Sequence, residues 1–311
     1  MGAPLVNILL STYNGEKYLR CQLDSLLAQD YPNFAIHVRD DGSTDGTLAV
    51  LRSYAAASPR VHILDDPDDG TAPNLGYARS FIRLLAESGG ADYYAFCDQD
   101  DAWEPDKVSR GVAALAARGG GLPRLYTSSY WFCDENLEKI SAPPPPPQSL
   151  PFRRTLFYST AIGFTMLLNR PLRDKVVAIG AEGGIPHDTL CEKVAALLGE
   201  CVCDSAKTAR YRRHRKTVTY TGAGRLRLIA KWLRGDVFGS VMKDYRRYVT
   251  RVYEAIGDDP SIRSEDRRCL ELFRERRQTP AVYFGRLLYP HRLRPSLGGE
   301  LALRLCFLLA R

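Results

Sequence analysis

Long apolar runs are missing from this 311-residue chain. No stretch approaches the roughly 18 to 20 apolar residues of a membrane-spanning helix. The nearest candidate, "LGGELALRLCFLLAR" at the C-terminus, is too short and contains Glu300 and Arg304. The first residues, "MGAPLVNILLSTYNG", also lack a basic region followed by an apolar run, so no secretory signal is predicted. We therefore expect a cytoplasmic protein.

Paired cysteines are missing as well. The eight cysteines are scattered, form no Cys-X-X-Cys pair, and mostly lie inside apolar runs. A chain of this length does not need disulfides to hold a core, so a disulfide scaffold is excluded. Cys201 and Cys203 would share one face of a strand, but two thiolates alone are too few for a metal site. We expect reduced, structural thiols.

Nucleic-acid-binding motifs are absent although the chain is basic. Lys and Arg outnumber Asp and Glu by 43 to 36, and the excess collects after about residue 205, in "RYRRHRK", "KDYRRYVTR", "RERRQ" and "HRLRP". Such a region suits nucleic acid, an anionic membrane surface or phosphate-bearing substrates. Because no zinc-finger spacing, RNA-binding signature or helix-turn-helix pattern accompanies it, we expect no nucleic-acid partner.

The first 120 residues alternate between two hydrophobic periods. Apolar runs of strand length cover residues 6–11, 34–40, 60–64 and 92–98, and helical patterns such as "GEKYLRCQLDSLLAQ" separate them. Strands that alternate with helices predict a parallel sheet with helices on both faces. The fold class predicted from this pattern is therefore α/β.

The later part of the chain is less regular. "RLYTSSYWFCD" and "CVCDSAKTARYRRH" read as strands, "APPPPPQSLP" as an extended loop, and the sequence from about residue 223 as helical. We predict a catalytic domain over residues 1–222, divided into halves at about 1–120 and 121–222. Residues 223–311 form a basic helical C-terminal region.

Polar clusters follow each predicted strand of the first half. They read "STYNGE", "RDDGSTDGT", "DDPDDGTAPN" and "CDQDD". Ligands of parallel sheets bind outside the carboxyl ends of the strands. The four clusters therefore predict one site at one edge of the sheet.

The cluster "CDQDD" places three carboxylates, Asp98, Asp100 and Asp101, directly after a buried strand. Such charges need compensation by a divalent metal, by Lys or Arg partners, or by exposure to water. Alternation along an extended segment aims Asp98 and Asp100 at one site while Gln99 turns away. Mg²⁺ and Mn²⁺ commonly bind one or two carboxylates together with substrate phosphates, so this Asp-X-Asp motif predicts a Mn or Mg site.

The cluster "RDDGSTDGT" has two interpretations. Ser43, Thr44 or Asp45 would cap the following helix, which makes the segment an ordinary turn. Alternatively, a carboxylate at this strand end accepts the ring N–H of a pyrimidine base, with Tyr13 of the neighbouring loop as a stacking face.

Three segments together carry a family resemblance. "VNILLSTYNGEKYLRCQLDSLLAQDYPNFAIHVRDDGSTDGT", "NLGYARSF" and "ADYYAFCDQDDAWEPDKV" resemble the N-terminal signature of the family 2 inverting glycosyltransferases, and "FCDQDDAW" is similar to their rhamnosyltransferase-like branch. The resemblance is close over residues 5–110 and looser to about residue 220, through "GFTMLLNR", "PHD" and "YRRH". It implies a GT-A type fold, with a Rossmann-like, mostly parallel sheet, helices on both faces and a helical C-terminal extension.

The resemblance also implies roles for individual residues. The nucleotide-sugar pocket would contain Thr12, Tyr13, Asn14, Glu16, Asp40, Asp41, Arg79, Asp98, Gln99 and Asp101. Asp100 would bind the metal, with His214 as a further ligand. Two simpler interpretations stay open, namely that Arg79 is a helix-surface arginine and that His214 is a solvent-exposed residue of a basic run.

The second half of the resemblance implies the catalytic base and the acceptor site. Asp188 of "GGIPHD" would deprotonate the acceptor hydroxyl. His187 and Trp103 would contact the acceptor. Alternatively, Asp188 is a helix N-cap and Trp103 belongs to the core. Thr189, Leu190 and Cys191 stand where the branch usually has aromatic residues, and this difference bears on the identity of the acceptor.

The resemblance implies a metal-dependent inverting glycosyltransferase. It would move rhamnose or another hexose from a nucleotide-diphosphate donor to a glycan acceptor, free or lipid-linked, in cell-surface polysaccharide synthesis. The interleaved basic and apolar residues of 223–256 and 281–311 suit an interfacial helix, so we expect peripheral contact with the inner face of the cell membrane. The alternatives are a nucleotide-sugar binding protein without turnover and a nucleotidyltransferase.

Overall fold

The computed structural model divides the chain into two compact units. The residues that it describes are 2–64, 73–119, 121–147, 149–181, 184–213 and 241–309. The first unit comprises Met1–Ser149, Ala161–Ala195 and Gly199–Lys216, and the second comprises Leu150–Thr160, Ala196–Leu198 and Thr217–Arg311. The domain boundary predicted at residue 222 falls among residues outside the described ranges, so it stays a prediction.

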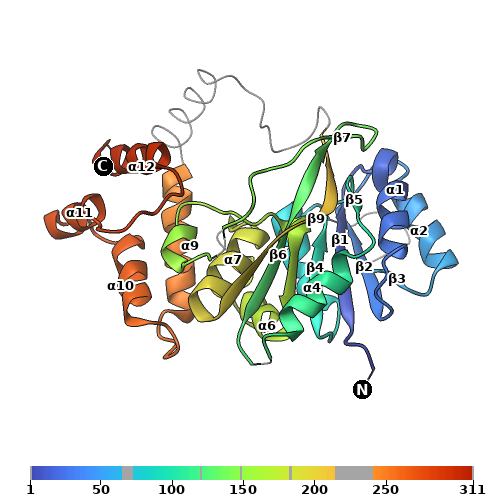
Figure 1. Cartoon of the computed structure of the whole chain (residues 1–311), viewed down its shortest axis with the longest axis horizontal. Helices are drawn as coiled ribbons and strands as arrows, with labels where there is room; N and C mark the ends of the chain where they lie inside the picture. Colours follow the sequence, from blue (N-terminus) through green and yellow to red (C-terminus); the bar gives the residue numbers. More distant parts are fainter. Residues whose placement is uncertain are drawn as a thin grey trace. The chain divides into compact units, whose positions relative to one another are not determined.

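A nine-stranded sheet forms the centre of the first unit, in the order β3-β2-β1-β4-β8-β6-β9-β5, with β7 paired to β6 (Figure 1). The strands are β1 (Val6–Thr12), β2 (Phe34–Asp40), β3 (Val61–Ile63), β4 (Tyr93–Cys97), β5 (Ala102–Trp103), β6 (Arg124–Cys133), β7 (Lys139–Ser141), β8 (Met166–Asn169) and β9 (Glu200–Arg212). The first four strands pair in parallel, as their apolar runs predicted. The second half is mixed, because β8 runs antiparallel to both β4 and β6.

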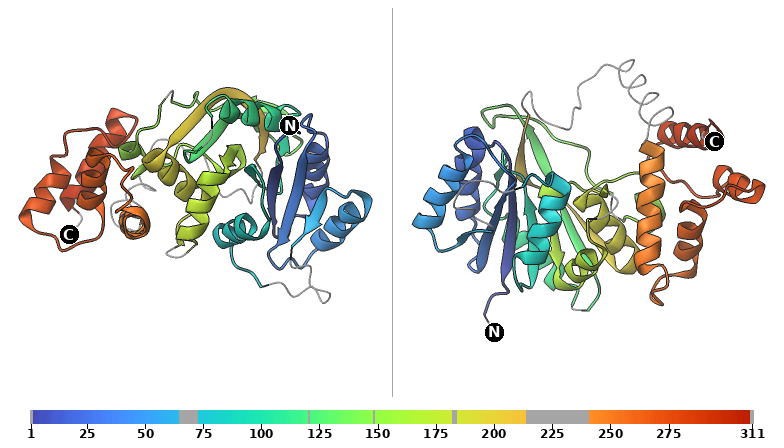
Figure 2. Two further views of the ribbon diagram at one scale, coloured as in Figure 1. Left: turned by 90° about the horizontal axis from the view of Figure 1, so that it is seen from below. Right: turned by 180° about the vertical axis from the view of Figure 1, so that it is seen from behind.

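Helices cover both faces of this sheet (Figure 2). They are α1 (Glu16–Leu27), α2 (Thr47–Ala57), α3 (Tyr77–Glu87), α4 (Lys107–Ala116), α6 (Arg170–Ile179) and α7 (His187–Leu198). Ile8 and Leu10 of β1 belong to the core that α1, α2 and α4 cover. On the other face, Phe96 of β4 meets Phe81 of α3. The predicted α/β class with helices on both faces is confirmed.

The strand pairing brings the polar loops together. Thr12, the last residue of β1, pairs with Asp40, the last residue of β2. Cys97, the last residue of β4, pairs with Leu10 near the end of β1. The loops after these three strands therefore lie at one edge of the sheet, as predicted. Most of the loop after β3, residues 65–72, lies outside the described residues.

The second unit is helical. It contains α5 (Phe152–Thr155), α9 (Val241–Ile256), α10 (Ser264–Phe273), α11 (Pro280–Leu287) and α12 (Leu297–Leu309). Its core is aromatic, since Phe157 packs edge-on against both Phe273 and Phe307 at ring distances of 5.3 Å. Within the ranges that the structure describes, no helix has the length and apolar character needed to cross a membrane.

Candidate active site

Hydrogen bonds join the loops after β1 and β2, and each loop donates to the other. Asn14 donates its backbone N–H to Ser43 Oγ (2.8 Å), and its side-chain oxygen accepts the backbone N–H of Thr44 (2.8 Å). Glu16 likewise accepts the backbone N–H of Gly46 (3.0 Å) at the start of α2. Asn14 and Glu16 therefore fix the geometry of the two loops.

Asp40 lies buried where the two strands end. Its carboxylate accepts from Thr12 Oγ1 (2.8 Å), from the backbone N–H of Ser43 (2.8 Å) and from Ser43 Oγ (2.6 Å). Hydrogen bonds of this kind favour a charged carboxylate. Both Asp40 and Thr12 thus hold the loop at the base of the site. Their predicted contact with a nucleotide stays a prediction.

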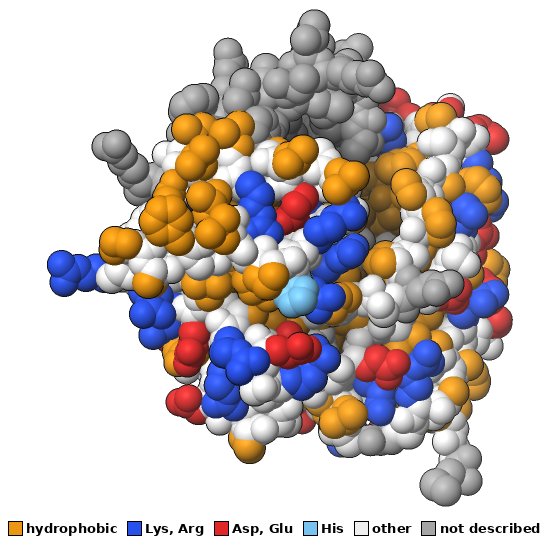
Figure 3. Space-filling model, turned by 60° about the vertical axis from the view of Figure 1, so that its left-hand side comes forward, with side chains coloured by type: hydrophobic (Ala, Val, Ile, Leu, Met, Phe, Trp, Pro, Cys, Tyr) orange, Lys and Arg blue, Asp and Glu red, His pale blue; other side chains and the backbone are white. Residues whose placement is uncertain are grey.

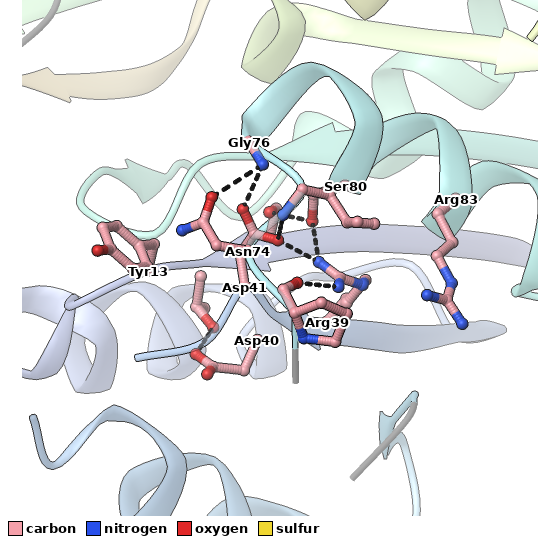
Figure 4. Close-up of polar contacts among 12 residues, drawn as sticks. Tyr13, Arg39, Asp40, Asp41, Asn74, Gly76, Ser80 and Arg83 are labelled. Carbon is pink, nitrogen blue, oxygen red and sulfur yellow. Dashed lines mark hydrogen bonds and ion pairs between the residues drawn. The ribbon is translucent and has the colours of Figure 1, made fainter. Parts of the chain in front are cut away.

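Asp41 anchors the start of α3 (Figure 4). Its carboxylate accepts the backbone N–H groups of Leu75 (2.7 Å) and Gly76 (2.8 Å). It also forms a buried ion pair with Arg39 (2.5 Å), whose guanidinium reaches the carbonyl oxygen of Pro73 (2.9 Å). A buried ion pair is stable only when most of its remaining polar positions are satisfied, and here Leu75, Gly76 and Pro73, in the chain leading into α3, satisfy most of them.

Gln99 connects the loop after β4 to the loop after β1. Its amide oxygen accepts the backbone N–H of Tyr13 (2.8 Å), and its amide nitrogen donates to the carbonyl oxygen of Tyr13 (3.0 Å). A side chain on Gly15 would place its Cβ 2.2 Å from this oxygen, so the approach requires glycine at position 15. Gln99 thus links the two loops, and its predicted contact with the nucleotide sugar stays a prediction.

Three carboxylates come together from two distant parts of the sequence. Burial, together with the negative charges of Asp100 and Asp188, raises the pKa of Asp98 to about 7. Asp98 and Asp100 follow β4, whereas Asp188 lies in the first turn of α7. The structure thus brings the predicted metal motif close to the predicted base.

Asp188 has a free carboxylate oxygen. No side chain caps α7, which excludes the alternative of Asp188 as its N-cap. Asp188 Oδ1 accepts the backbone N–H of Thr189 (2.6 Å), and within the described ranges Oδ2 has no hydrogen bond. The N-terminus of a helix stabilises a negative charge, so this position favours an ionised carboxylate with one oxygen available.

Asp101 is fully buried, and its predicted place in the nucleotide-sugar pocket stays a prediction. Its Oδ1 accepts the backbone N–H of Arg212 (2.9 Å) at the end of β9, and burial raises its pKa well above the usual range. Arg212 also donates to the carbonyl oxygen of Asp100 (2.7 Å) and to that of Glu135. Arg212 therefore holds the loop that contains Asp100 and Asp101 in place.

Trp103 belongs to the core of the first unit, and its predicted contact with the acceptor stays a prediction. It is 5% exposed, lies in β5 opposite Ala209 of β9, and donates its backbone N–H to Ser25 Oγ (3.0 Å). The ammonium group of Lys107 lies 4.9 Å from the centre of its ring. Because β5 pairs with β9, the side chain of Trp103 packs in the core of the first unit, as the alternative interpretation of this residue predicted.

His187 is also buried, and its predicted contact with the acceptor stays a prediction. Its ring packs against Phe81 (4.2 Å) and Phe96 (4.6 Å), and neither ring nitrogen has a hydrogen-bond partner among the described residues. Burial lowers its pKa to about 4, so the ring is neutral at pH 7. Its role is to pack the start of α7 against α3 and β4.

The remaining predicted residues have different environments. Tyr13 is 49% exposed, so its ring is available for stacking. Arg79 is exposed on α3, which fits either a surface arginine or a contact with a diphosphate. His214, the predicted additional metal ligand, lies outside the described residues.

The carboxylates fit a metal that the donor helps to bind. Within the described residues, no three His, Cys, Asp or Glu side chains form a ready-made metal site. Among the described residues, the charges that shift the pKa of Asp98 are the negative charges of Asp100 and Asp188. Asp100, with Asp98 beside it, would hold a divalent cation whose other ligands come from a diphosphate and water, as hard cations commonly bind.

Arg39 was missed in the sequence. It is 1% exposed and occupies an otherwise apolar strand, directly before the two carboxylates of "RDDG". A buried charge requires a partner, so an arginine at that position could have identified Asp41 as its ion-pair partner. The ion pair with Arg39 indicates that Asp41 has a structural role, in addition to the binding role that the resemblance implies.

The fold of this chain is similar to that of solved glycosyltransferases of the GT-A type. The TarS fragment 1–349 of S. aureus, solved with UDP-GlcNAc, has a TM-score of 0.52 at 16% identity, over 85% of this chain and 78% of that one. The mannosyltransferase PcManGT of Pyrobaculum calidifontis, solved with GDP-Man and Mn²⁺, has a TM-score of 0.55 at 15% identity, over 98% and 76%. At this identity the likeness shows the fold alone, and it confirms the predicted GT-A type.

The sequence comparison identifies the family of the N-terminal part. Residues 7–129 match the family model described as Glycosyl transferase family 2, which confirms the resemblance there. TuaG of Bacillus subtilis, whose name refers to teichuronic acid biosynthesis, is 31% identical over 37% of this chain and 43% of its own. The dTDP-rhamnosyl transferase RfbG of Shigella flexneri is 32% identical over 34% and 36%. The chain thus spans less than half the length of these relatives.

Proposed function

We propose that this chain is a metal-dependent, inverting glycosyltransferase that uses a nucleotide-diphosphate sugar. The observation that carries the proposal is the meeting of Asp98, Asp100 and Asp188 at the edge where the loops after β1, β2 and β4 converge. The family match over residues 7–129 and the donors named in TarS and PcManGT support it.

The donor would bind on the loops after β1, β2 and β4, which hydrogen bonds join to one another. The exposed ring of Tyr13 would stack on the base, and the loop containing Asp40 and Asp41 would surround it. Asp100 would hold Mn²⁺ or Mg²⁺ against the diphosphate, with Asp98 towards the ribose and sugar. A divalent cation bound there would offset the negative charge of the departing diphosphate.

Asp188 would act as the base. An inverting transfer needs one group that takes the proton of the acceptor hydroxyl as its oxygen attacks the anomeric carbon, opposite the departing diphosphate. Asp188 Oδ2 would take that proton, while the backbone N–H of Thr189 holds Oδ1 in place. Asp188 stands in the first turn of α7, where the N-terminus of a helix interacts favourably with a negatively charged side chain.

We further propose that the donor sugar is rhamnose or another hexose and that the acceptor is a glycan, free or lipid-linked, of a cell-surface polysaccharide. The name of RfbG, a dTDP-rhamnosyl transferase, supports rhamnose as the sugar. The name of TuaG, which refers to teichuronic acid biosynthesis, supports a role in cell-surface polysaccharide synthesis. A lipid-linked acceptor would bring the chain to the cytoplasmic face of the membrane, where its basic C-terminal part would make peripheral contact.

The test is a screen of nucleotide-sugar donors for nucleoside-diphosphate release, with and without Mn²⁺ and acceptor glycans. Asp188→Asn should lower turnover by about 10²- to 10⁴-fold while donor affinity stays close to that of the wild type. Asp100→Asn should abolish the response to Mn²⁺. Asp174→Asn, on an exposed aspartate of α6, is the matched control and should behave as wild type. Unchanged transfer by Asp188→Asn would exclude it as the base, and release that does not depend on metal would exclude the role of Asp100.

A further inference from the structure

The outer side of α12 carries a row of exposed leucines. Leu297, Leu301, Leu305 and Leu308 follow one another at intervals of four, four and three residues, which places them on one side of a helix. Leu297 and Leu301 are each 70% exposed. The opposite side of α12 buries Leu303, Cys306 and Phe307 in the core of the second unit. A helix that is apolar on both sides needs a second apolar environment besides that core.

Helix α11 extends this apolar surface. Phe284 and Leu288, one turn apart, are 54% and 70% exposed. The two helices are joined directly, because Tyr283 donates its hydroxyl to the carbonyl oxygen of Leu308 (3.3 Å) and Arg304 donates to that of Leu287 (2.9 Å). Hydrophobic side chains gather on this face in Figure 3. A contiguous apolar patch of this kind marks an interaction surface, which a single exposed leucine does not.

Arginines without an acidic partner among the described residues lie near the aromatic core of the second unit, and one of them, Arg286, is 6% exposed and donates to the carbonyl oxygens of Leu272 (2.7 Å) and Arg274 (2.6 Å). Arg246 and Arg286 line a shallow pocket of the second unit together with Phe157, Phe273, Tyr283 and Phe307. Burial, with Arg246 and Arg276 as neighbouring positive charges, lowers the pKa of Arg286 to about 10. In the part of the chain that the structure describes, Arg246, Arg276 and Arg286 form no ion pair with an acidic side chain. Such a group of cations suits an anion from outside the chain.

We propose that α11 and α12 dock on an anionic lipid bilayer, with the leucine row at the boundary between headgroups and acyl chains and with Arg246 and Arg276 near the lipid phosphates. Apolar residues beside arginines are what an interfacial helix needs. A second copy of the chain fits less well, because a two-fold contact through the same patch would bring the unpaired arginines of both copies close together. The inference deepens the membrane contact of the proposed function, but it does not depend on sugar transfer.

The test is co-sedimentation of the full chain with phosphatidylcholine vesicles, with and without phosphatidylglycerol. The wild type should bind the anionic vesicles more strongly, and salt should weaken that binding. The double variant Leu301→Gln, Leu305→Gln should lower the partition coefficient at least about tenfold. The double variant Arg246→Gln, Arg276→Gln should remove the preference for anionic lipid. Leu122→Gln and Ile140→Gln, on exposed apolar residues of the first unit, are the controls and should bind as wild type.

Circular dichroism and donor release in the absence of vesicles separate docking from folding and from catalysis. All variants should keep the helical content and the turnover of the wild type in solution. Failure of the wild type to bind either vesicle, or equal binding by the leucine variant, would overturn the proposal and leave the transferase assignment untouched. A dimer of the wild type that the leucine variant loses, without any vesicle binding, would assign the patch to a second copy and would also overturn it.

Discussion

His187 is a neutral histidine enclosed by aromatic rings, and its burial predicts a dependence of stability on pH. Its pKa falls from the ordinary 6.5 to about 4 in the folded chain. Between these values the unfolded chain binds a proton that the folded chain does not, so the free energy of unfolding falls as the pH drops from 6.5 to 4. The loss attributable to this group reaches at most about 3 kcal/mol. His187→Leu should therefore make the stability curve flatter in this range, as measured by urea unfolding at successive pH values.

His37 provides the comparison for this prediction. It stacks on His62 at 5.2 Å, and its pKa is likewise lowered to about 4 by burial and by His62. His37→Gln should remove a comparable part of the pH dependence, because the pKa of His37 is lowered over the same range as that of His187. If the curve of His187→Leu runs parallel to that of the wild type from pH 6.5 to 4, His187 is not neutral in the folded chain.

At the scale of elements, the loops after β1, β2 and β4 hold one another in place, and Gly15 makes this possible. An added Cβ would lie 2.2 Å from the amide oxygen of Gln99. Gly15→Ala should therefore displace Gln99 from Tyr13, and loss of these hydrogen bonds costs about 1–3 kcal/mol. We expect the KM for the donor to rise by roughly five- to a hundredfold with a smaller change in kcat. Donor-dependent kinetics of the purified variant measure this effect.

Gly90→Ala is the matched control for the glycine substitution. An added Cβ at Gly90 meets no atom within 4 Å, so donor kinetics should equal those of the wild type. Gln99→Glu should reproduce the effect of Gly15→Ala, because a carboxylate cannot donate to the carbonyl oxygen of Tyr13. Wild-type kinetics in both Gly15→Ala and Gln99→Glu would show that the connection between these loops does not position the donor.

The elements also show what a single sequence predicts. The segments that end at Thr12, Asp40 and Cys97 are largely apolar, so the sequence predicted them as strands. Because parallel strands end at the same edge of a sheet, it also predicted that the loops after them lie together. Trp103 and His187 could not be placed in the same way, because their burial depends on β9 and α3, which are distant in the sequence. Likewise, most polar residues of "STYNGE" were predicted as ligand contacts, yet they bond to neighbouring loops. Sequence patterns therefore identified the edge of the sheet that carries the site. They did not identify which polar side chains at that edge form hydrogen bonds with the backbone of neighbouring loops.

At the scale of the whole molecule, ligand binding should stabilise the two units unequally. Because the described residues hold no complete metal site, the divalent cation and the nucleoside diphosphate should each complete the site of the other. Mn²⁺ alone and nucleoside diphosphate alone should each raise the midpoint of thermal unfolding only slightly. Together, at about a hundred times their dissociation constants, they should raise it by roughly 5 to 10 °C.

Calorimetry locates this effect because the chain consists of two compact units. The shift should belong to the transition of the first unit, which contains Asp98, Asp100 and Asp188, and the transition of the second unit should stay where it is. EDTA should reverse the shift, and Asp100→Asn should abolish the synergy but leave the small effect of the nucleotide. An equal shift with Mn²⁺ alone would contradict a site shared between protein and donor, since it would mean that the protein binds the cation without the diphosphate.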